Sequence, residues 1–196
     1  MCFKKVFLTM TSITDADNII IQGTTIEKYL SIPLQTWYKS GGYCGSISAS
    51  YIFKFYDQVV HDNYVATDMQ NNTENCFIDL MIHYCDTDGT LGSTTTELQY
   101  GMTSYLIDIG IGNSAYSKSY FDFSTFKSQI NKNRPLSVTI GPNDPTYGYH
   151  WITGHGYYQD ANNIDAYIII NDGWGRNNVW IESNRNTLDD MVYLED

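Results

Sequence analysis

The stretch Gly41-Gly42-Tyr43-Cys44-Gly45-Ser46 leads directly into the longest apolar helical pattern of the chain, residues 47–60. Apolar side chains recur there every three or four positions, which predicts a helix that is buried on a wide face. The glycine pair places Cys44 at the first turn of this helix, where unsatisfied N–H groups and a partial positive charge favour a thiolate over a thiol. Cys44 is therefore a candidate nucleophile, and the alternative is a small buried residue of the core.

The composition is that of one folded domain. The chain has 196 residues, of which 42% are hydrophobic and 17% are charged, enough for a single domain with its own core. Its 22 acidic and 11 basic residues give a net charge of −11, which repels phosphate backbones and argues against a nucleic-acid partner. The four cysteines are scattered and predict neither a disulfide framework nor a zinc site. We find no motif for a metal or another cofactor and expect none.

The N-terminal residues carry little information. We expect residues 1–29 to form an arm or a short strand ahead of the main domain, residues 30–196, because their one apolar run, Ile19-Ile20-Ile21, is short. The chain has a basic start, but the apolar stretch that follows is too short for a signal peptide, and no segment is long enough to span a membrane. We therefore expect a soluble monomer.

The part of the chain that follows the Cys44 helix continues with helical patterns. Apolar spacing predicts a helix over residues 77–84. Thr94 and Glu97 form a capping box that opens a helix over residues 94–109. A shorter helix is expected within residues 124–134. Up to this point, apart from the N-terminal arm, the sequence predicts helices only.

From residue 136 onward, the period of the apolar residues changes from about four to two, which is typical of strands. Strands are expected at residues 136–140, 150–158, 167–172, 179–181 and 191–194. A short polar turn joins the second and third of these strands, which predicts an antiparallel hairpin. Helices followed by strands indicate an α+β domain.

Two histidines of this hairpin are candidates for the base that a cysteine nucleophile requires. In an antiparallel hairpin the first residues of one strand lie opposite the last residues of the other, which places His150 near Asn171 and Asp172. His155 lies five residues further along the strand, roughly 17 Å away and on the opposite face. Hairpin geometry therefore selects His150, for which the alternative is an exposed strand histidine.

Asn171 and Asp172 are both candidates for the residue that orients the imidazole of His150. Neighbouring strand residues face opposite sides, so only one of the two can point toward the histidine, and the sequence does not separate an amide from a carboxylate. Trp174 follows directly and either shields this hydrogen bond from water or belongs to the core. For the oxyanion of an acyl-transfer reaction, the candidate donors are the backbone N–H of the cysteine and the side chain of Gln35.

The order of these motifs resembles that of the papain-like cysteine peptidases, and more closely that of the bacterial free-standing relatives of the bacteriocin-processing (double-glycine) peptidases. The shared features are a glutamine at 35, Gly-Tyr-Cys-Gly at 42–45, His-Trp-Ile-Thr-Gly at 150–154 and Asn-Asp-Gly-Trp-Gly at 171–175. The resemblance extends from about residue 30 to residue 174. Related sequences often read Cys-Gly-Pro-Thr and carry a glycine before the histidine, whereas this chain has Cys-Gly-Ser-Ile and Tyr149.

The resemblance implies a papain-like α+β fold in which a central N-terminal helix carries Cys44 and packs against a C-terminal antiparallel β-sheet. It implies Cys44 as the nucleophile and His150 as the base. The orienting residue would be Asp172 or Asn171, and the oxyanion glutamine would be Gln35. The neighbouring residues that we expect to line a substrate cleft are Gly42, Tyr43, Tyr149 and Trp174.

The resulting hypothesis is a cysteine peptidase that hydrolyses peptide bonds through an acyl-enzyme, with a peptide or protein as substrate. Two alternatives stay open. One is a papain-like peptide-binding module without turnover, since a fold does not guarantee an activity, and the other is an acyltransferase that uses the same cysteine and histidine. The resemblance also implies a bacterial protein that is secreted or at the cell surface, while a cytoplasmic location stays open.

Overall fold

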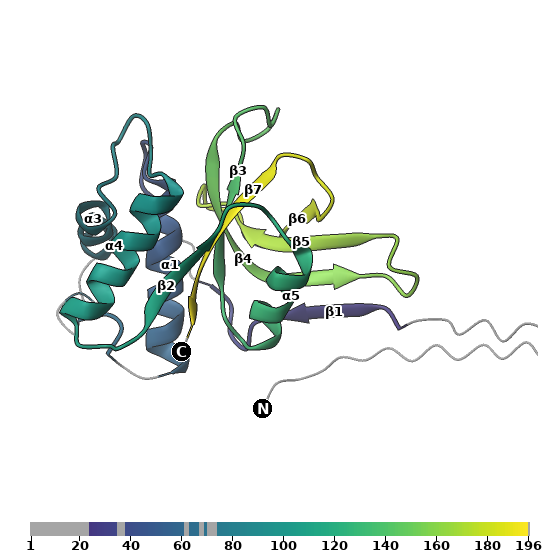
Figure 1. Cartoon of the computed structure of the whole chain (residues 1–196), viewed down its shortest axis with the longest axis horizontal. Coiled ribbons are helices and arrows are strands. Elements are labelled where there is room, and N and C mark those ends of the chain that lie inside the picture. The colour runs from purple at the N-terminus through teal and green to yellow at the C-terminus, as the bar shows by residue number, and fades with distance from the viewer. Residues whose placement is uncertain (1–23, 35–37, 61–62, 67–68, 70–73, 196) are drawn as a thin grey trace, which may run out of the picture.

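The computed structural model describes residues 24–34, 38–60, 63–66, 69 and 74–195. Within these residues the helices are α1 (Cys44–Val59), α3 (Glu74–Tyr84), α4 (Thr95–Asp108) and α5 (Phe123–Asn131) (Figure 1). The strands are β1 (Ile26–Tyr29), β2 (Ser114–Lys118), β3 (Leu136–Ile140), β4 (His150–Gln159), β5 (Ala166–Asn171), β6 (Val179–Glu182) and β7 (Leu188–Glu195). The fold is α+β, as the sequence predicts.

The strands form one antiparallel sheet in the order β2-β7-β3-β4-β5-β6. Strand β1 pairs with residues 156–159 of β4, on the edge of β4 whose first half pairs with β3. The predicted hairpin is confirmed by the pairing of β4 with β5, in which Thr153 lies opposite Asn171. Strand β4 therefore has neighbours on both sides and begins at His150.

Several elements differ from the sequence-based expectation: helix α3 and strand β7 each begin three residues before the predicted start, and β5 ends at Asn171 rather than Asp172. Strand β2 lies in a region for which we predicted only helices. Most of its side chains are polar and Ala115 alone is buried, so the sequence shows little of the alternation that identifies a strand. Pairing with β7 stabilises it. Helix α5 begins at Phe123 rather than Ser124, since the carboxylate of Asp122 caps the helix by accepting hydrogen bonds from the N–H groups of Ser124 and Thr125.

The N-terminal strand is part of the same sheet. Residues 26–29 lie in the segment that we assigned to an arm or a short strand, and they pair with β4. The N–H of Leu30 donates to the carbonyl of His155 at 2.9 Å, so contact with β4 continues past the end of β1. The apolar run Ile19-Ile20-Ile21 lies outside the described residues.

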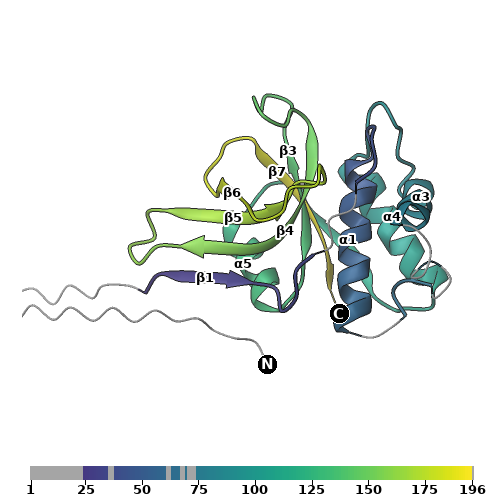
Figure 2. The same cartoon turned by 180° about the vertical axis from the view of Figure 1, so that it is seen from behind.

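Helix α1 lies between the sheet and the helices α3 and α4, as Figures 1 and 2 show from opposite sides. The rings of Phe53, Phe77 and Tyr105 meet edge to face where these three helices join, with centroids 4.9 to 6.4 Å apart. Helix α4 begins with the predicted capping box, in which the Thr94 and Glu97 side chains each accept a hydrogen bond from the other residue's N–H. The packing of Phe53 against Phe77 and Tyr105 anchors the outer face of α1 to these two helices.

The inner face of α1 meets the sheet through buried hydroxyl groups. The Oγ atom of Ser48 lies 2.6 Å from Ser137 Oγ on β3 and 2.6 Å from Thr153 Oγ1 on β4. Ser137 and Thr153 are themselves opposite each other in the sheet. Buried polar groups are costly unless they are paired, so these hydrogen bonds favour one rotation of the helix over the two strands.

A close contact between α3 and α4 gives a test of the packing. A Cβ atom on Gly101 would lie 2.5 Å from the carbonyl oxygen of Tyr84 and 2.6 Å from Cys85 Cα, both backbone atoms that cannot move alone. We expect Gly101→Ala to lower the free energy of unfolding by about 1–3 kcal/mol despite the higher helix propensity of alanine. Urea denaturation measures this. Gly112→Ala, whose Cβ would meet nothing within 4 Å, is the control and should change stability by less than about 0.5 kcal/mol.

Candidate active site

Cys44 is the first residue of α1, as the sequence predicts. Gly41 has a φ of +114°, a conformation that favours glycine, and the N–H of Gly42 donates to the carbonyl of Gly89 at 2.7 Å. The N-cap residue Tyr43 makes no side-chain capping hydrogen bond. The glycine pair thus shapes the turn that leads into the helix. The side chain of Tyr43 caps none of the N–H groups of the first turn.

The residue after the cysteine allows β4 to approach the helix closely. A Cβ atom on Gly45 would lie 3.0 Å from Ser93 Oγ and 3.2 Å from Trp151 Cδ1. The Nε1–H of Trp151 donates to the carbonyl of Ser93 at 2.9 Å. Because Trp151 directly follows His150, this contact fixes the start of β4 beside the start of α1.

Cys44 and His150 line the same small cavity, of about 90 Å³. The other lining residues are Tyr38, Lys39, Gly41, Ile47, Gly173 and Trp174. A larger hollow, of about 560 Å³, lies near Val59 at the opposite end of α1 and is lined by neither the cysteine nor the histidine. We therefore assign the smaller of these two cavities to the candidate site, since it combines the candidate nucleophile with the candidate base.

The orientation of His150 is fixed by a backbone atom. Its Nε2 lies 2.7 Å from the carbonyl oxygen of Asp172. A carbonyl only accepts hydrogen bonds, so Nε2 carries the proton and, in a neutral ring, Nδ1 is the unprotonated nitrogen. The histidine is 4% exposed. The ring is thus held in the tautomer that leaves Nδ1 free to accept a proton.

Two aromatic rings flank this imidazole. The ring of Tyr147 is nearly parallel to that of His150, with centroids 5.6 Å apart, and the ring of Trp174 lies 4.4 Å from it at an angle of 38°. The sequence did not indicate Tyr147, because it lies in the loop between β3 and β4, where no periodicity links it to the histidine. Trp174 is 45% exposed and lies against the imidazole rather than in the core; its shielding of the hydrogen bond stays a prediction.

The two candidates for the third residue lie at the end of β5: Asn171 is the last residue of the strand and Asp172 is the first residue after it. Their side chains accept hydrogen bonds from the loop that follows. The carboxylate of Asp172 accepts hydrogen bonds from the N–H groups of Trp174 (2.9 Å) and Arg176 (3.0 Å) and from Arg176 Nε. The Asn171 side-chain oxygen accepts from the N–H of Gly173 at 2.9 Å. The atom of this pair that is bonded to the imidazole is the backbone oxygen of Asp172.

The remaining predicted site residues are placed as follows. Gln35 lies outside the described residues. Of the four residues that we expected to line a substrate cleft, Trp174 lines the cavity, whereas Gly42, Tyr43 and Tyr149 do not. Tyr149 is 44% exposed, with its hydroxyl 3.5 Å from the carbonyl of Ser93.

His155 is placed apart from the site. The pairing of β4 with β5 shifts between Gly154 and Gly156, so His155 lies in a β-bulge that interrupts the regular alternation of faces. Its ring is 3% exposed and lies 6.2 Å from that of Tyr29. Burial lowers its pKa to about 4.

This burial predicts a pH-dependent stability. In the unfolded chain His155 should titrate near its ordinary pKa of about 6.5, so between that pH and pH 4 the unfolded state binds more protons and stability is lost as the pH falls. From pH 7 to pH 4 the loss from this residue should be roughly 3 kcal/mol. Urea denaturation of the wild type and of His155→Gln across this range measures it, and a constant difference between the two proteins would contradict it.

Burial acts on both members of the cysteine–histidine pair. It raises the pKa of the Cys44 thiol, against the backbone N–H groups of Trp151 and Gly45, which lower it. It lowers the pKa of His150, against the Asp172 carbonyl and carboxylate, which raise it. Burial therefore outweighs the effect of the helix start on the thiol, which the sequence led us to expect, and it favours the neutral thiol and the neutral imidazole.

The neutral pair predicts how the thiol reacts with pH. Because the pKa of Cys44 is raised, the rate of its alkylation by iodoacetamide should keep rising above pH 8.5, the ordinary range of a thiol. Mass spectrometry of the peptide that contains Cys44 measures the rate, with a short cysteine peptide as reference. A plateau of the rate below pH 7 would instead indicate a thiolate–imidazolium pair.

The part of the chain that the structure describes contains no group of three or more His, Cys, Asp or Glu side chains arranged to hold a metal ion. None of the helices in those residues combines the length and the apolar character needed to cross a membrane.

A helix that begins with a cysteine and packs against an antiparallel sheet that carries a histidine defines the class of the papain-like cysteine peptidase fold. Within that class, the family model of the Peptidase C39-like family matches residues 29–195. The chain belongs to this family. The relationship to papain-like cysteine peptidases that the sequence motifs indicate is thereby confirmed.

The solved structures that share the fold include the following two. A protein from Bacillus anthracis that is described as a C39-like peptidase is 12% identical, with a TM-score of 0.52 over 86% of this chain and 98% of that chain. UfSP from C. elegans is also 12% identical, with a TM-score of 0.52 over 94% of this chain and 36% of that chain. No curated protein matches the sequence. At 12% identity, these two structures support the fold and nothing further.

Proposed function

We propose that this protein is a cysteine peptidase that hydrolyses peptide bonds through an acyl-enzyme, with Cys44 as the nucleophile and His150 as the general base and acid. The observation that carries the proposal is the hydrogen bond from His150 Nε2 to the Asp172 carbonyl, which leaves Nδ1 as the base in a cavity that Cys44 also lines. A nucleophile, an adjacent base and a group that orients the base are what acyl transfer requires.

Acylation begins when Cys44 Sγ attacks the carbonyl carbon of the peptide bond and its proton passes to His150 Nδ1. The bond between carbon and nitrogen then breaks, and the leaving amine takes the proton from Nδ1. The positive charge that His150 carries between these steps is opposed by burial and favoured by the Asp172 carbonyl and carboxylate. The imidazolium is therefore a short-lived intermediate rather than the resting state.

Deacylation uses the same histidine. Water attacks the thioester and gives its proton to Nδ1, after which the bond between carbon and sulfur breaks and the thiol regains the proton. In both tetrahedral intermediates the oxygen carries negative charge at the start of α1. The backbone N–H groups of the first turn, which the Tyr43 side chain leaves uncapped, are the proposed donors for this oxyanion, and Gln35 is a proposed further donor.

The central test is the loss of hydrolysis when the thiol is removed. Cys44→Ala should lower the rate of cleavage of a fluorogenic peptide library by at least about a thousandfold, because it removes the acyl-enzyme route. Cys76→Ala, which removes an exposed cysteine from α3, is the matched control and should retain the wild-type rate. Equal cleavage by wild type and Cys44→Ala would disprove the proposal.

The other two hypotheses predict different outcomes of the same assay. A binding module would bind peptides without turnover and without an acyl-enzyme on Cys44. An acyltransferase would form the acyl-enzyme but give it preferentially to an added amine, which is measured as the ratio of the amide product to the hydrolysed product. Hydrolysis that exceeds transfer at millimolar amine supports the peptidase.

A further inference from the structure

We propose that Arg176 is a positioning residue of this site: with the carboxylate of Asp172 it fixes the loop of residues 172–176, and through that loop it holds the imidazole of His150 in its reactive orientation. Arg176 does not line the cavity that contains Cys44, so it would act on the reaction without contact to the reacting atoms. This inference rests on the proposed function and adds a residue to its machinery.

The loop is closed by hydrogen bonds in both directions. The N–H of Asp172 donates to the carbonyl of Arg176 at 3.1 Å, and the N–H of Arg176 donates to the Asp172 carboxylate at 3.0 Å. Between these residues, Gly173 and Gly175 have φ values of +70° and +89°, which glycine adopts readily. The resulting tight turn aims the carbonyl of Asp172 at His150 Nε2.

The carboxylate of Asp172, at the centre of the turn, is buried and therefore requires a cation and hydrogen-bond donors. The Asp172 side chain is 0% exposed and forms an ion pair with Arg176 Nε at 2.5 Å. A buried carboxylate is stable only when it is paired and hydrogen-bonded. Arg176 supplies the cation, and the N–H groups of Trp174 and Arg176 supply further hydrogen bonds. Without this cation, the turn that carries the histidine's acceptor would lose its charge balance.

Arg176 also spans the two rings that flank the histidine. Its guanidinium carbon lies 5.7 Å from the ring centre of Tyr147 and 5.8 Å from that of Trp174, within the range of cation–π attraction. These two rings are 5.2 Å from each other, and both contact His150. The guanidinium therefore joins the loop before β4 to the loop after β5 on the outer side of the imidazole.

The neighbouring ion pair, between Asp144 and Arg185, stabilises a different loop. Asp144 is bonded to Arg185 at 2.5 Å and accepts hydrogen bonds from the N–H groups of Thr146 and Tyr147. It therefore holds the loop of Tyr147, whereas Arg176 reaches both the Tyr147 ring and the loop that bears the histidine's acceptor. Arg176 is thus the residue whose removal should disturb the histidine most directly.

The charges around His150 give this role a signature that a purely structural role would lack. Asp172 favours the imidazolium, and Arg176 disfavours it. The other titratable groups around the ring and its cavity are Cys44, Tyr38, Lys39, Tyr147, Asp144 and Arg185. These are the same in every variant compared. Removing the Arg176 charge should raise the pKa of His150, because it removes a cation that disfavours the imidazolium.

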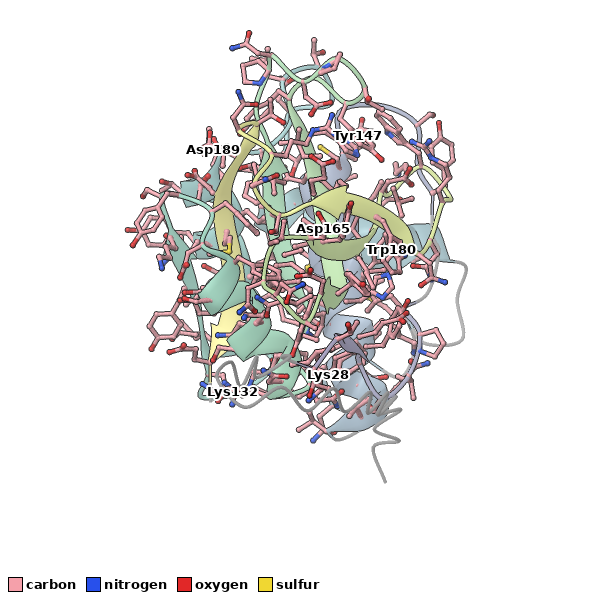
Figure 3. All side chains as sticks on the ribbon, turned by 90° about the vertical axis from the view of Figure 1, so that its right-hand side faces the viewer. Lys28, Lys132, Tyr147, Asp165, Trp180 and Asp189 are labelled. Carbon is pink, nitrogen blue, oxygen red and sulfur yellow. The ribbon has the colours of Figure 1, made fainter. Side chains whose placement is uncertain are left out.

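The experiment is an NMR titration of the His150 imidazole together with peptide-cleavage kinetics, in the wild type, Arg176→Met, Arg176→Gln and Arg176→Lys. The His150→Gln spectrum assigns the signal among the four histidines. Lys132→Met removes an exposed cation at the end of the molecule opposite Tyr147 (Figure 3) and is the control for net charge. Thermal unfolding shows that each variant is folded.

We expect the pKa of His150 to rise in Arg176→Met and Arg176→Gln but to stay at the wild-type value in Lys132→Met. In the first two variants kcat should fall by up to about a hundredfold, because the base is misplaced, while KM changes less than about twofold. Arg176→Lys should keep the wild-type pKa and recover part of kcat. If Arg176→Met does not fold, Arg176→Gln, which keeps an N–H donor for Asp172, decides the test.

The proposal is overturned if the folded neutral variants keep the wild-type pKa of His150 and the wild-type kcat. It is also overturned if KM rises while kcat is unchanged, since Arg176 would then contact the substrate. A wild type that cleaves no peptide would refute the proposed function alone, because the titration of His150 requires no turnover and still measures the effect of Arg176.

Discussion

The site depends on the close approach of the first turn of α1 to the start of β4. Gly45 has almost no room for a side chain between Ser93 and Trp151, and one turn further on Ser48 bonds to hydroxyl groups of β3 and β4. These contacts fix both the separation and the rotation of the helix relative to the sheet. Cys44 at the start of the helix and His150 at the start of the strand therefore line one cavity.

Around this frame, two buried carboxylates hold the loops that contact the imidazole of His150. Asp144 and Asp172 are both bonded to backbone N–H groups of their own loops and to an arginine. A buried carboxylate requires several donors, so the loops that provide them are restricted to few conformations. Those loops present Tyr147, Trp174 and the Asp172 carbonyl to the imidazole. Loop geometry, rather than a carboxylate hydrogen-bonded to the ring, orients the imidazole of His150.

Much of the fold follows from local patterns in the sequence. The apolar repeat of α1, the capping box of α4 and the alternation in β3 correspond to elements that the structure contains. Strand β2 escaped prediction because a mostly exposed strand is stabilised by its partner β7 and not by its own alternation. The position of His155 deviates from a regular strand because the β-bulge at this residue depends on the pairing of β4 with β5.

The sequence by itself determined the elements of the site: a cysteine at a helix start, a histidine at the start of a hairpin and an Asn-Asp pair at the end of the hairpin's second strand. Antiparallel pairing is sufficient for this, because it relates positions along two strands by counting. Only the tertiary structure decided which atom touches the imidazole, which rings flank it and where Arg176 lies. Those features depend on burial and on the conformation of two loops, which no periodicity in the sequence encodes.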